Sequence, residues 1–187
     1  MKRPFRANRT RPPLWAGGLA LALALAPLAC KPAPKTVKVV MPEGEAPTLA
    51  STVRTSEASQ EPQLLSGFYG VENNSWRWTA RQFSVLLRTP IGGSQSGATL
   101  DLAFTIPQVA IDHSKSLTLS VSVEGTPLPS ETFNKSGPCE YRHDVPPSAL
   151  RKDAVRVQFS LDKAMPPSGA DRRELGVIVA SVGLEPK

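Results

Sequence analysis

Few side chains in this sequence are of the types that carry out catalysis. Its 187 residues include two histidines and two cysteines. His143 lies four positions after Cys139, a pairing that could suggest a thiol nucleophile beside its base. On a strand, however, these side chains share one face at a separation of about 13 Å, too far for a hydrogen bond. We therefore expect a buried cysteine and a surface histidine, and we predict that the protein is not an enzyme.

Metal and cofactor sites have equally little support. Glu140 and Asp144 flank His143, but a chain with two histidines offers few metal ligands, and we predict neither a metal nor a cofactor. The other histidine, His113, follows Asp112 in a segment expected to be a polar loop at the end of a strand. The sequence contains no phosphate-binding glycine loop, no HExxH and no GxSxG motif.

Aromatic residues are concentrated in residues 67–79 (GFYGVENNSWRWT). On a strand, Trp76 and Trp78 point to one side and Arg77 to the other. One interpretation is an aromatic platform for a sugar ring, with Tyr69, Trp76, Arg77 and Trp78 as the ligand contacts. The alternative is structural: Trp78 belongs to the core, Trp76 covers the edge of the fold, and Arg77 forms an ion pair.

Two acids and two bases lie at the opening of the last expected strand, in residues 171–177 (DRRELGV). Asp171 and Arg173 belong to this cluster. Together with Glu72 and Arg77 it could form a charge network between the first and last strands. Paired charges of this kind fix the register of strands more than they add stability.

The elements that hold these residues are strands. Alternation of apolar and polar residues is clear in 82–87, 98–106, 117–123 and 155–161, and 175–184 is a more continuous apolar run. Weaker strands are expected at 63–69, 131–134 and 140–145, and one helical turn at 147–153. Glycine- and proline-containing turns separate them. We predict one all-β domain over residues 63–187, an antiparallel β-sandwich of seven or eight strands, with a jelly-roll order as the expected version.

The net charge of +6 comes largely from the beginning of the chain. Five of the 22 basic residues are Lys2, Arg3, Arg6, Arg9 and Arg11. If they are removed, 17 bases face 16 acids, and the net charge becomes +1. A nearly neutral protein has no electrostatic basis for binding nucleic acid, and we predict no such partner.

These basic residues begin a secretory signal. They precede the uncharged run 14–29, which is too short to span a bilayer easily and ends at Ala29 and Cys30. This ending resembles the bacterial lipoprotein signal, in which the chain is cut before a cysteine that receives lipid. The resemblance implies a signal peptide over residues 1–29, lipidation of Cys30 and attachment to a membrane. Lys31 after the cysteine favours the outer membrane over the inner one.

Residues 30–62 are rich in proline, alanine, serine, threonine and glutamate and contain no aromatic residue. Such a composition buries too little apolar surface to offset the entropy of ordering. We predict a flexible tether between the lipid and the sandwich.

The two clusters together resemble a β-sandwich module that is appended to bacterial glycosyltransferases of cell-surface polysaccharides. Five residues match its first motif: Gly67, Phe68, Glu72, Arg77 and Trp78. Five match its second: Asp171, Arg173, Leu175, Gly176 and Val177. The resemblance implies a sandwich fold and an accessory role near envelope glycans, without catalytic residues. This chain departs from the module's usual setting because it carries a lipoprotein-like leader and no transferase domain.

These observations predict a lipid-anchored envelope protein whose non-catalytic sandwich binds a glycan or a glycan-decorated surface. The alternative is a structural or assembly subunit that docks to another envelope protein through a sheet edge or a loop.

Overall fold

The structure is a computed structural model that describes residues 48–187. The predicted signal peptide, the predicted lipidation site Cys30 and the first part of the predicted tether lie outside the described residues. Within residues 48–187, no helix is both long enough and apolar enough to cross a membrane.

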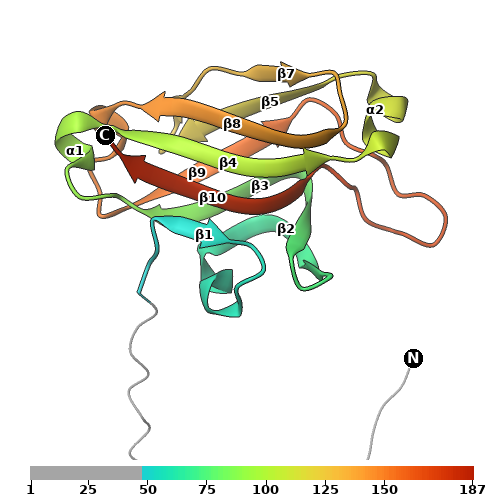
Figure 1. Cartoon of the computed structure of the whole chain (residues 1–187), viewed down its shortest axis with the longest axis horizontal. Coiled ribbons are helices and arrows are strands. Elements are labelled where there is room, and N and C mark those ends of the chain that lie inside the picture. Colours follow the sequence, from blue (N-terminus) through green and yellow to red (C-terminus); the bar gives the residue numbers. More distant parts are fainter. Residues whose placement is uncertain (1–47) are drawn as a thin grey trace, which may run out of the picture. The chain divides into compact units, whose positions relative to one another are not determined.

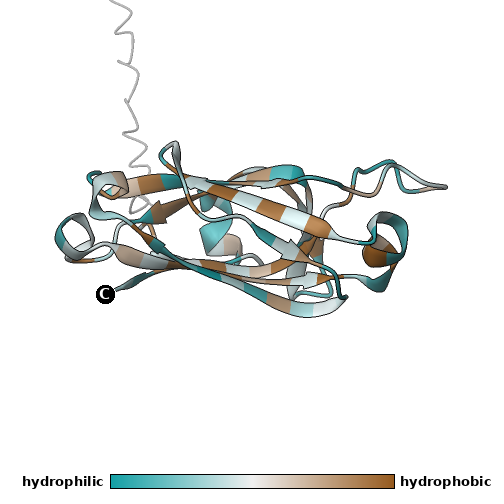
Figure 2. Cartoon of the chain, turned by 90° about the horizontal axis from the view of Figure 1, so that it is seen from above, coloured by the Kyte–Doolittle hydropathy of each residue, from teal (hydrophilic) through white to brown (hydrophobic). Residues whose placement is uncertain are grey.

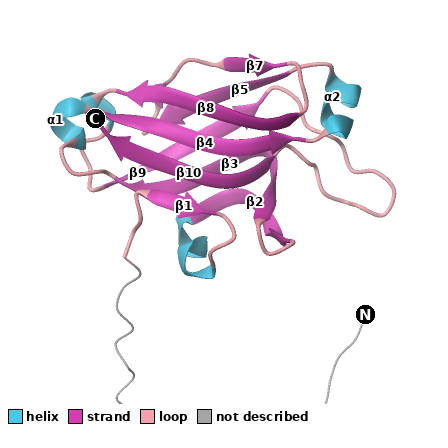
Figure 3. Ribbon diagram, in the orientation of Figure 1, coloured by secondary structure: helices cyan, strands magenta, loops and turns pink. Residues whose placement is uncertain are grey.

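Strands dominate the described part of the chain, and the few helices are short (Figure 3). The ten strands are β1 (Thr52–Arg54), β2 (Leu64–Glu72), β3 (Trp76–Arg88), β4 (Ala98–Ile106), β5 (Leu117–Val123), β6 (Thr126–Pro127), β7 (Glu131–Phe133), β8 (Gly137–Val145), β9 (Ala154–Leu161) and β10 (Ile178–Pro186). The α-helices are α1 (Gly93–Ser96) and α2 (Gln108–Ser114), and the 3-10 helices are η1 (Ala58–Gln63) and η2 (Pro147–Ala149). Helices α1 and α2 lie at opposite ends of the strands (Figure 3).

All strand pairs are antiparallel, and the sheet curls into two layers (Figure 1). The strand order is β6-β5-β9-β3-β10-β4-β8, with β1 beside β10, β2 beside β3 and β7 beside β5. The long strand β3 pairs with β10 through Arg77 and Trp78 and with β9 through residues 82–88. Because one strand pairs with both, β3 connects the layer of β10, β4 and β8 to the layer of β9 and β5.

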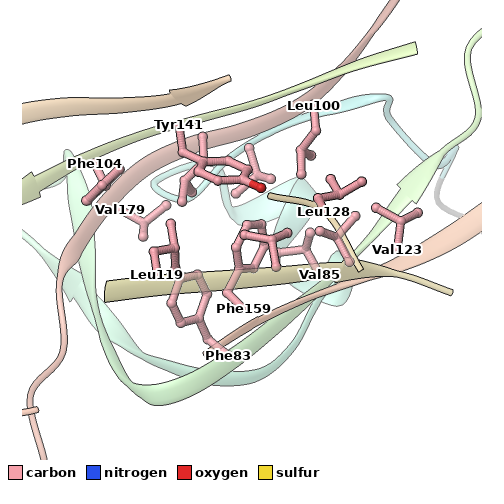
Figure 4. Packing of buried hydrophobic residues seen from close by; sticks show 14 of the residues in the cluster. Phe83, Val85, Leu100, Phe104, Leu119, Val123, Leu128, Tyr141, Phe159 and Val179 are labelled. Atoms are coloured by element: carbon pink, nitrogen blue, oxygen red, sulfur yellow. The ribbon is translucent and has the colours of Figure 1, made fainter. Parts of the chain in front are cut away.

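The core lies between these layers. Burial alternates residue by residue along β4 and β5, and brown residues alternate with paler ones along the strands in Figure 2. In Figure 4, Tyr141 and Leu100 of one layer face Phe159 and Val85 of the other. The fully buried Tyr141 donates a hydrogen bond from its hydroxyl to the carbonyl oxygen of Pro129 at 2.7 Å, and burial raises its pKa to about 12. Each buried apolar side chain of this kind stabilises the fold by about 1.5–3 kcal/mol.

The predicted all-β antiparallel sandwich is confirmed, with ten strands in place of seven or eight. Every predicted strand overlaps an observed one, and four of the eight (98–106, 117–123, 131–134 and 155–161) agree within one residue at both ends. The helical turn expected at 147–153 is η2. The segment with His113, expected to be a polar loop, is instead the helix α2, which begins after Pro107. The strand expected at 175–184 begins later, at Ile178. Residues before it pair elsewhere, since the amide of Leu175 donates to the carbonyl oxygen of Met165 at 2.9 Å.

The fold starts earlier than the predicted boundary at residue 63, so the tether prediction is wrong for residues 52–62. Val53 and Thr55 are fully buried, and β1 pairs with β10. The buried side-chain amide of Gln63 donates to the carbonyl of Leu86 at 2.7 Å and exchanges hydrogen bonds with the backbone of Ala50. The polar residues of this segment are ordered by hydrogen bonds to partners distant in the sequence. The amino-acid composition of the segment does not reveal such partners.

Candidate functional site

The aromatic segment is a β-hairpin formed by β2 and β3. Asn73 and Asn74 both adopt left-handed backbone angles at its turn, a conformation that asparagine tolerates better than most residues. Trp76 and Trp78 follow on β3, and both are half-buried. Neither belongs to the central core cluster, so the interpretation of Trp78 as a core residue does not hold.

Arg77 is buried on the opposite side of β3, and this burial argues against the prediction that it contacts a ligand. Its Nε donates to the carbonyl oxygen of Thr55 at 2.7 Å, and its Nη1 donates to that of Tyr69 at 3.1 Å. The exposed Glu61 carboxylate lies 3.3 Å from the same Nη1. The guanidinium therefore connects β1, η1 and β2, and this agrees with the structural interpretation of Arg77.

The predicted charge network exists, but Arg173 is its central residue in place of Arg77. Arg173 contacts Glu72 at 2.9 Å and Asp171 at 2.9 Å. Its guanidinium lies 5.2 Å from the centre of the Tyr69 ring, and the Tyr69 hydroxyl donates to the carbonyl of Glu174 at 2.8 Å. One face of the Tyr69 ring and its hydroxyl are thus occupied by the loop before β10, and Tyr69, Trp76 and Trp78 are all half-buried.

Hydrogen bonds from Arg173 lower the pKa of Asp171 to about 2, and those from its side chain have a larger effect than the one from its backbone amide. A carboxylate whose pKa is lowered by folding stabilises the fold above its ordinary pKa of about 4, and this contribution is lost as the pH falls toward 2. Asp171→Asn is therefore expected to lower the thermal midpoint slightly at neutral pH, with a difference from wild type that disappears near pH 2. Thermal denaturation between pH 2 and pH 7 measures this difference. Asp153→Asn is the matched control, since this exposed carboxylate forms no ion pair within residues 48–187.

The remaining residues of the two motifs have structural roles. Gly67 has a φ of +74°, and a Cβ there would lie 2.0 Å from the carbonyl oxygen of Gln82. A Cβ on Gly176 would lie 2.7 Å from the carbonyl oxygen of Ala80. Phe68 packs edge-on against Phe83 with ring centres 5.4 Å apart. These glycines allow β2 and the loop before β10 to approach β3 closely.

The histidine and cysteine candidates do not form a catalytic pair. Cys139 is half-buried, and its thiol is 3.5 Å from the carbonyl of Gly137. His143 lies four residues farther along β8. Its Nε2 is 2.6 Å from the Oε1 of Glu131 on β7. Burial raises the pKa of the Cys139 thiol, which disfavours the reactive thiolate. In the described part of the chain, no three His, Cys, Asp or Glu side chains cluster as metal ligands.

A groove on the outward side of β2, β3, β9 and β5 was not anticipated. It has a volume of about 430 Å³ and is lined by serine and glutamine side chains together with Phe83, Val121, Pro127 and Phe159. The polar side chains lining it are Ser66, Gln82, Ser84, Ser120, Ser122, Gln158 and Ser160. We call this surface the serine–glutamine groove.

Strand register arranges these polar side chains in two rows. In the first row, Ser160 of β9 lies between Gln82 of β3 and Ser120 of β5. In the second row, Gln158 lies between Ser84 and Ser122, and Ser66 of β2 extends the row beyond Ser84. Directly paired residues of antiparallel strands point to the same side of the sheet, so each row presents a continuous line of polar groups.

The outward side of the other layer has a different chemistry. There, Arg142 of β8 contacts Asp101 of β4 at 2.7 Å and also pairs with Glu185 of β10. Lys187 pairs with Asp144 at 2.8 Å. One layer therefore carries paired charges, whereas the groove on the other is lined by uncharged polar groups.

Similarity to known proteins is found among solved structures. No protein-family model and no curated protein matches this chain. It is similar to the CBM36-1 domain of a multidomain xylanase from the hindgut metagenome of Trinervitermes trinervoides, at 13% identity and a TM-score of 0.42 over 73% of this chain and 96% of that one. A family 35 carbohydrate binding module from an environmental isolate is similar at 11% identity and a TM-score of 0.37, over 75% of this chain and 85% of that one.

A third similar structure is a family GH115 4-O-methyl-alpha-glucuronidase with specificity for decorated arabinogalactans. It shares 10% identity at a TM-score of 0.43, over 74% of this chain and 18% of that chain.

Proposed function

We propose that this protein is a non-catalytic glycan-binding domain of the bacterial envelope, attached by lipid at Cys30 to the outer membrane. The observation that supports glycan binding is the serine–glutamine groove. Hydroxyl and amide groups donate and accept hydrogen bonds, as do the hydroxyl groups of sugars. A volume of about 430 Å³ also lies within the range of about 300–1,000 Å³ typical of ligand sites.

The alternative role, docking to another envelope protein, has less support in the described residues. The large hydrophobic side chains exposed in the described residues are scattered: Leu65 and Val71 lie near opposite ends of β2, Ile91 lies in the loop before α1, and Val109 lies in α2. Single exposed hydrophobic residues are normal on a soluble surface, whereas a protein-binding surface usually presents a contiguous apolar patch.

Binding is tested with the full-length chain, purified in detergent, by electrophoresis in native gels that contain one soluble polysaccharide each. Dextran, mixed-linkage β-glucan, arabinoxylan and galactan serve as neutral probes, and alginate and polygalacturonate as acidic ones. We expect at least one probe to retard the protein without the release of reducing sugar. Failure of all six probes to retard the protein contradicts glycan binding, and release of sugar contradicts a non-catalytic role.

The same chain with Cys30→Ser separates the anchor from the binding domain. We expect this variant to leave the membrane fraction of cells and to keep its retardation in the gels. A variant that stays in the membrane fraction contradicts attachment at Cys30.

A further inference from the structure

We infer that the serine–glutamine groove is the binding site itself, and that it takes a chain of uncharged sugars lying across the strands. This inference rests on the proposed function and specifies its site and ligand class. It differs from the interpretation based on the aromatic segment, whose Arg77 is buried and whose Tyr69 is covered by Arg173.

The absence of charge in the groove selects for a neutral ligand. None of the described residues that line it is ionisable. A carboxylate or sulfate group placed there would lose part of its hydration without gaining an ionic partner, which is unfavourable. In contrast, a hollow near α1 is lined by Arg88, Arg151, Lys152 and Asp153. The lack of charge is therefore a property of this groove and not of every hollow on the domain.

Several polar groups in the groove are free to bind a ligand. Gln82 and Gln158 are exposed, and within the described residues their side chains make no hydrogen bond to protein. Each amide offers two donors and one acceptor. Because paired hydroxyl groups on a sugar ring also combine donors with acceptors, these two side chains match the chemistry of a saccharide.

Serines at both sides of the groove are held in place by hydrogen bonds to other serines. The hydroxyl groups of Ser66 and Ser84 lie 2.7 Å apart, and those of Ser120 and Ser130 lie 3.0 Å apart. The strands beneath are fixed by their backbone ladders. A ligand therefore meets a surface that is already ordered, and less conformational entropy is lost on binding.

The rows give the ligand a direction and a length. The second row crosses four strands, from Ser66 of β2 through Ser84 and Gln158 to Ser122 of β5. Neighbouring strands are about 4.8 Å apart, so the row extends for about 14 Å. This length suits a few sugar units of an extended chain that lies perpendicular to the strands, and it exceeds what a single ring can cover.

Two substitutions test the site in the native-gel assay with the neutral probe that retards the wild-type protein. Gln158→Ala removes the central amide and is expected to weaken binding about five- to tenfold. Ser160→Tyr fills the middle of the first row and is expected to abolish binding. Both positions are on the outward side of β9, so the thermal midpoint is expected to stay within about 2 °C of wild type.

Two variants serve as controls. Gln95→Ala removes an exposed glutamine from α1, which lies at one end of the strands (Figure 3) and does not line the groove, and this variant is expected to bind as wild type does. Trp76→Ala tests the aromatic segment in the same way. The inference is overturned if Trp76→Ala loses binding while Gln158→Ala and Ser160→Tyr keep it, although glycan binding itself then stands.

The same native gels test whether the ligand is uncharged. Retardation by dextran, β-glucan, arabinoxylan or galactan, and not by alginate or polygalacturonate, supports an uncharged chain. Retardation by the acidic probes alone overturns the class while leaving glycan binding in place. If no probe retards the wild-type protein, the proposed function fails, and the site assignment fails with it.

Discussion

Replacement of Gly67 by alanine is expected to lower the free energy of unfolding by about 3–5 kcal/mol. The backbone at this position has a φ of +74°, where a residue with a Cβ is strained. The added Cβ would also lie 2.0 Å from the carbonyl oxygen of Gln82 and 2.7 Å from the Cα of Phe83. Both are backbone atoms of the central strand β3, so relief of the contact requires displacement of β2 from its partner. Urea denaturation followed by circular dichroism measures the loss.

Gly70→Ala is the matched control in the same strand. A Cβ at this position meets no atom within 4 Å, and its φ is not in the left-handed region. We expect this variant to differ from wild type by less than about 0.5 kcal/mol. If Gly67→Ala were as stable as Gly70→Ala, the close approach of β2 to β3 at Phe83 would be wrong.

The strands of this domain are predictable because their pattern is local. In 117–123, apolar and polar residues alternate without exception, and β5 has those bounds and that burial. The short helix α2 is a different case. It has seven residues and follows Pro107, which occupies the position where a capping side chain would stand. So short a helix presents too few turns for its period to be recognised.

The roles of the two arginines depend on contacts that the sequence does not contain. Alternation along β3 correctly places Arg77 opposite Trp76 and Trp78, but it does not state which side faces inward. Hydrophobicity would place the tryptophans inside. In the structure Arg77 is the buried residue, because the carbonyl groups of Thr55 and Tyr69 accept hydrogen bonds from its guanidinium. Thr55 belongs to the segment predicted as a tether, so this partner could not have been anticipated.

The groove could not be located before the strand order was known. Its polar residues come from four segments that are distant in the sequence, and only the order β5-β9-β3, with β2 beside β3, brings them together. One signal was available: the outward positions of 117–123 and 155–161 are mostly serine, threonine and glutamine, where a solvated sheet surface usually carries charges as well. That composition indicates a surface with an unusual lack of charge, but it does not show which strands lie beside one another there.

Arg77→Met is expected to cost about 2–4 kcal/mol of stability. Methionine replaces the apolar stem of the arginine but donates no hydrogen bond. The carbonyl oxygens of Thr55 and Tyr69 would each lose a donor in a region from which water is largely excluded, since Arg77 is only 8% exposed. Unsatisfied buried acceptors account for most of this cost, and urea denaturation measures it.

Glu61→Ala distinguishes this explanation from a simple ion pair. The Glu61 side chain is 60% exposed, and an exposed ion pair contributes little, so we expect a change below about 0.5 kcal/mol. An equal loss in both variants would show that the ion pair, and not the backbone contacts, is what Arg77 provides. If Arg77→Met instead kept its stability and lost polysaccharide binding, Arg77 would be the ligand contact that the sequence predicted, and the hairpin would replace the groove as the binding site.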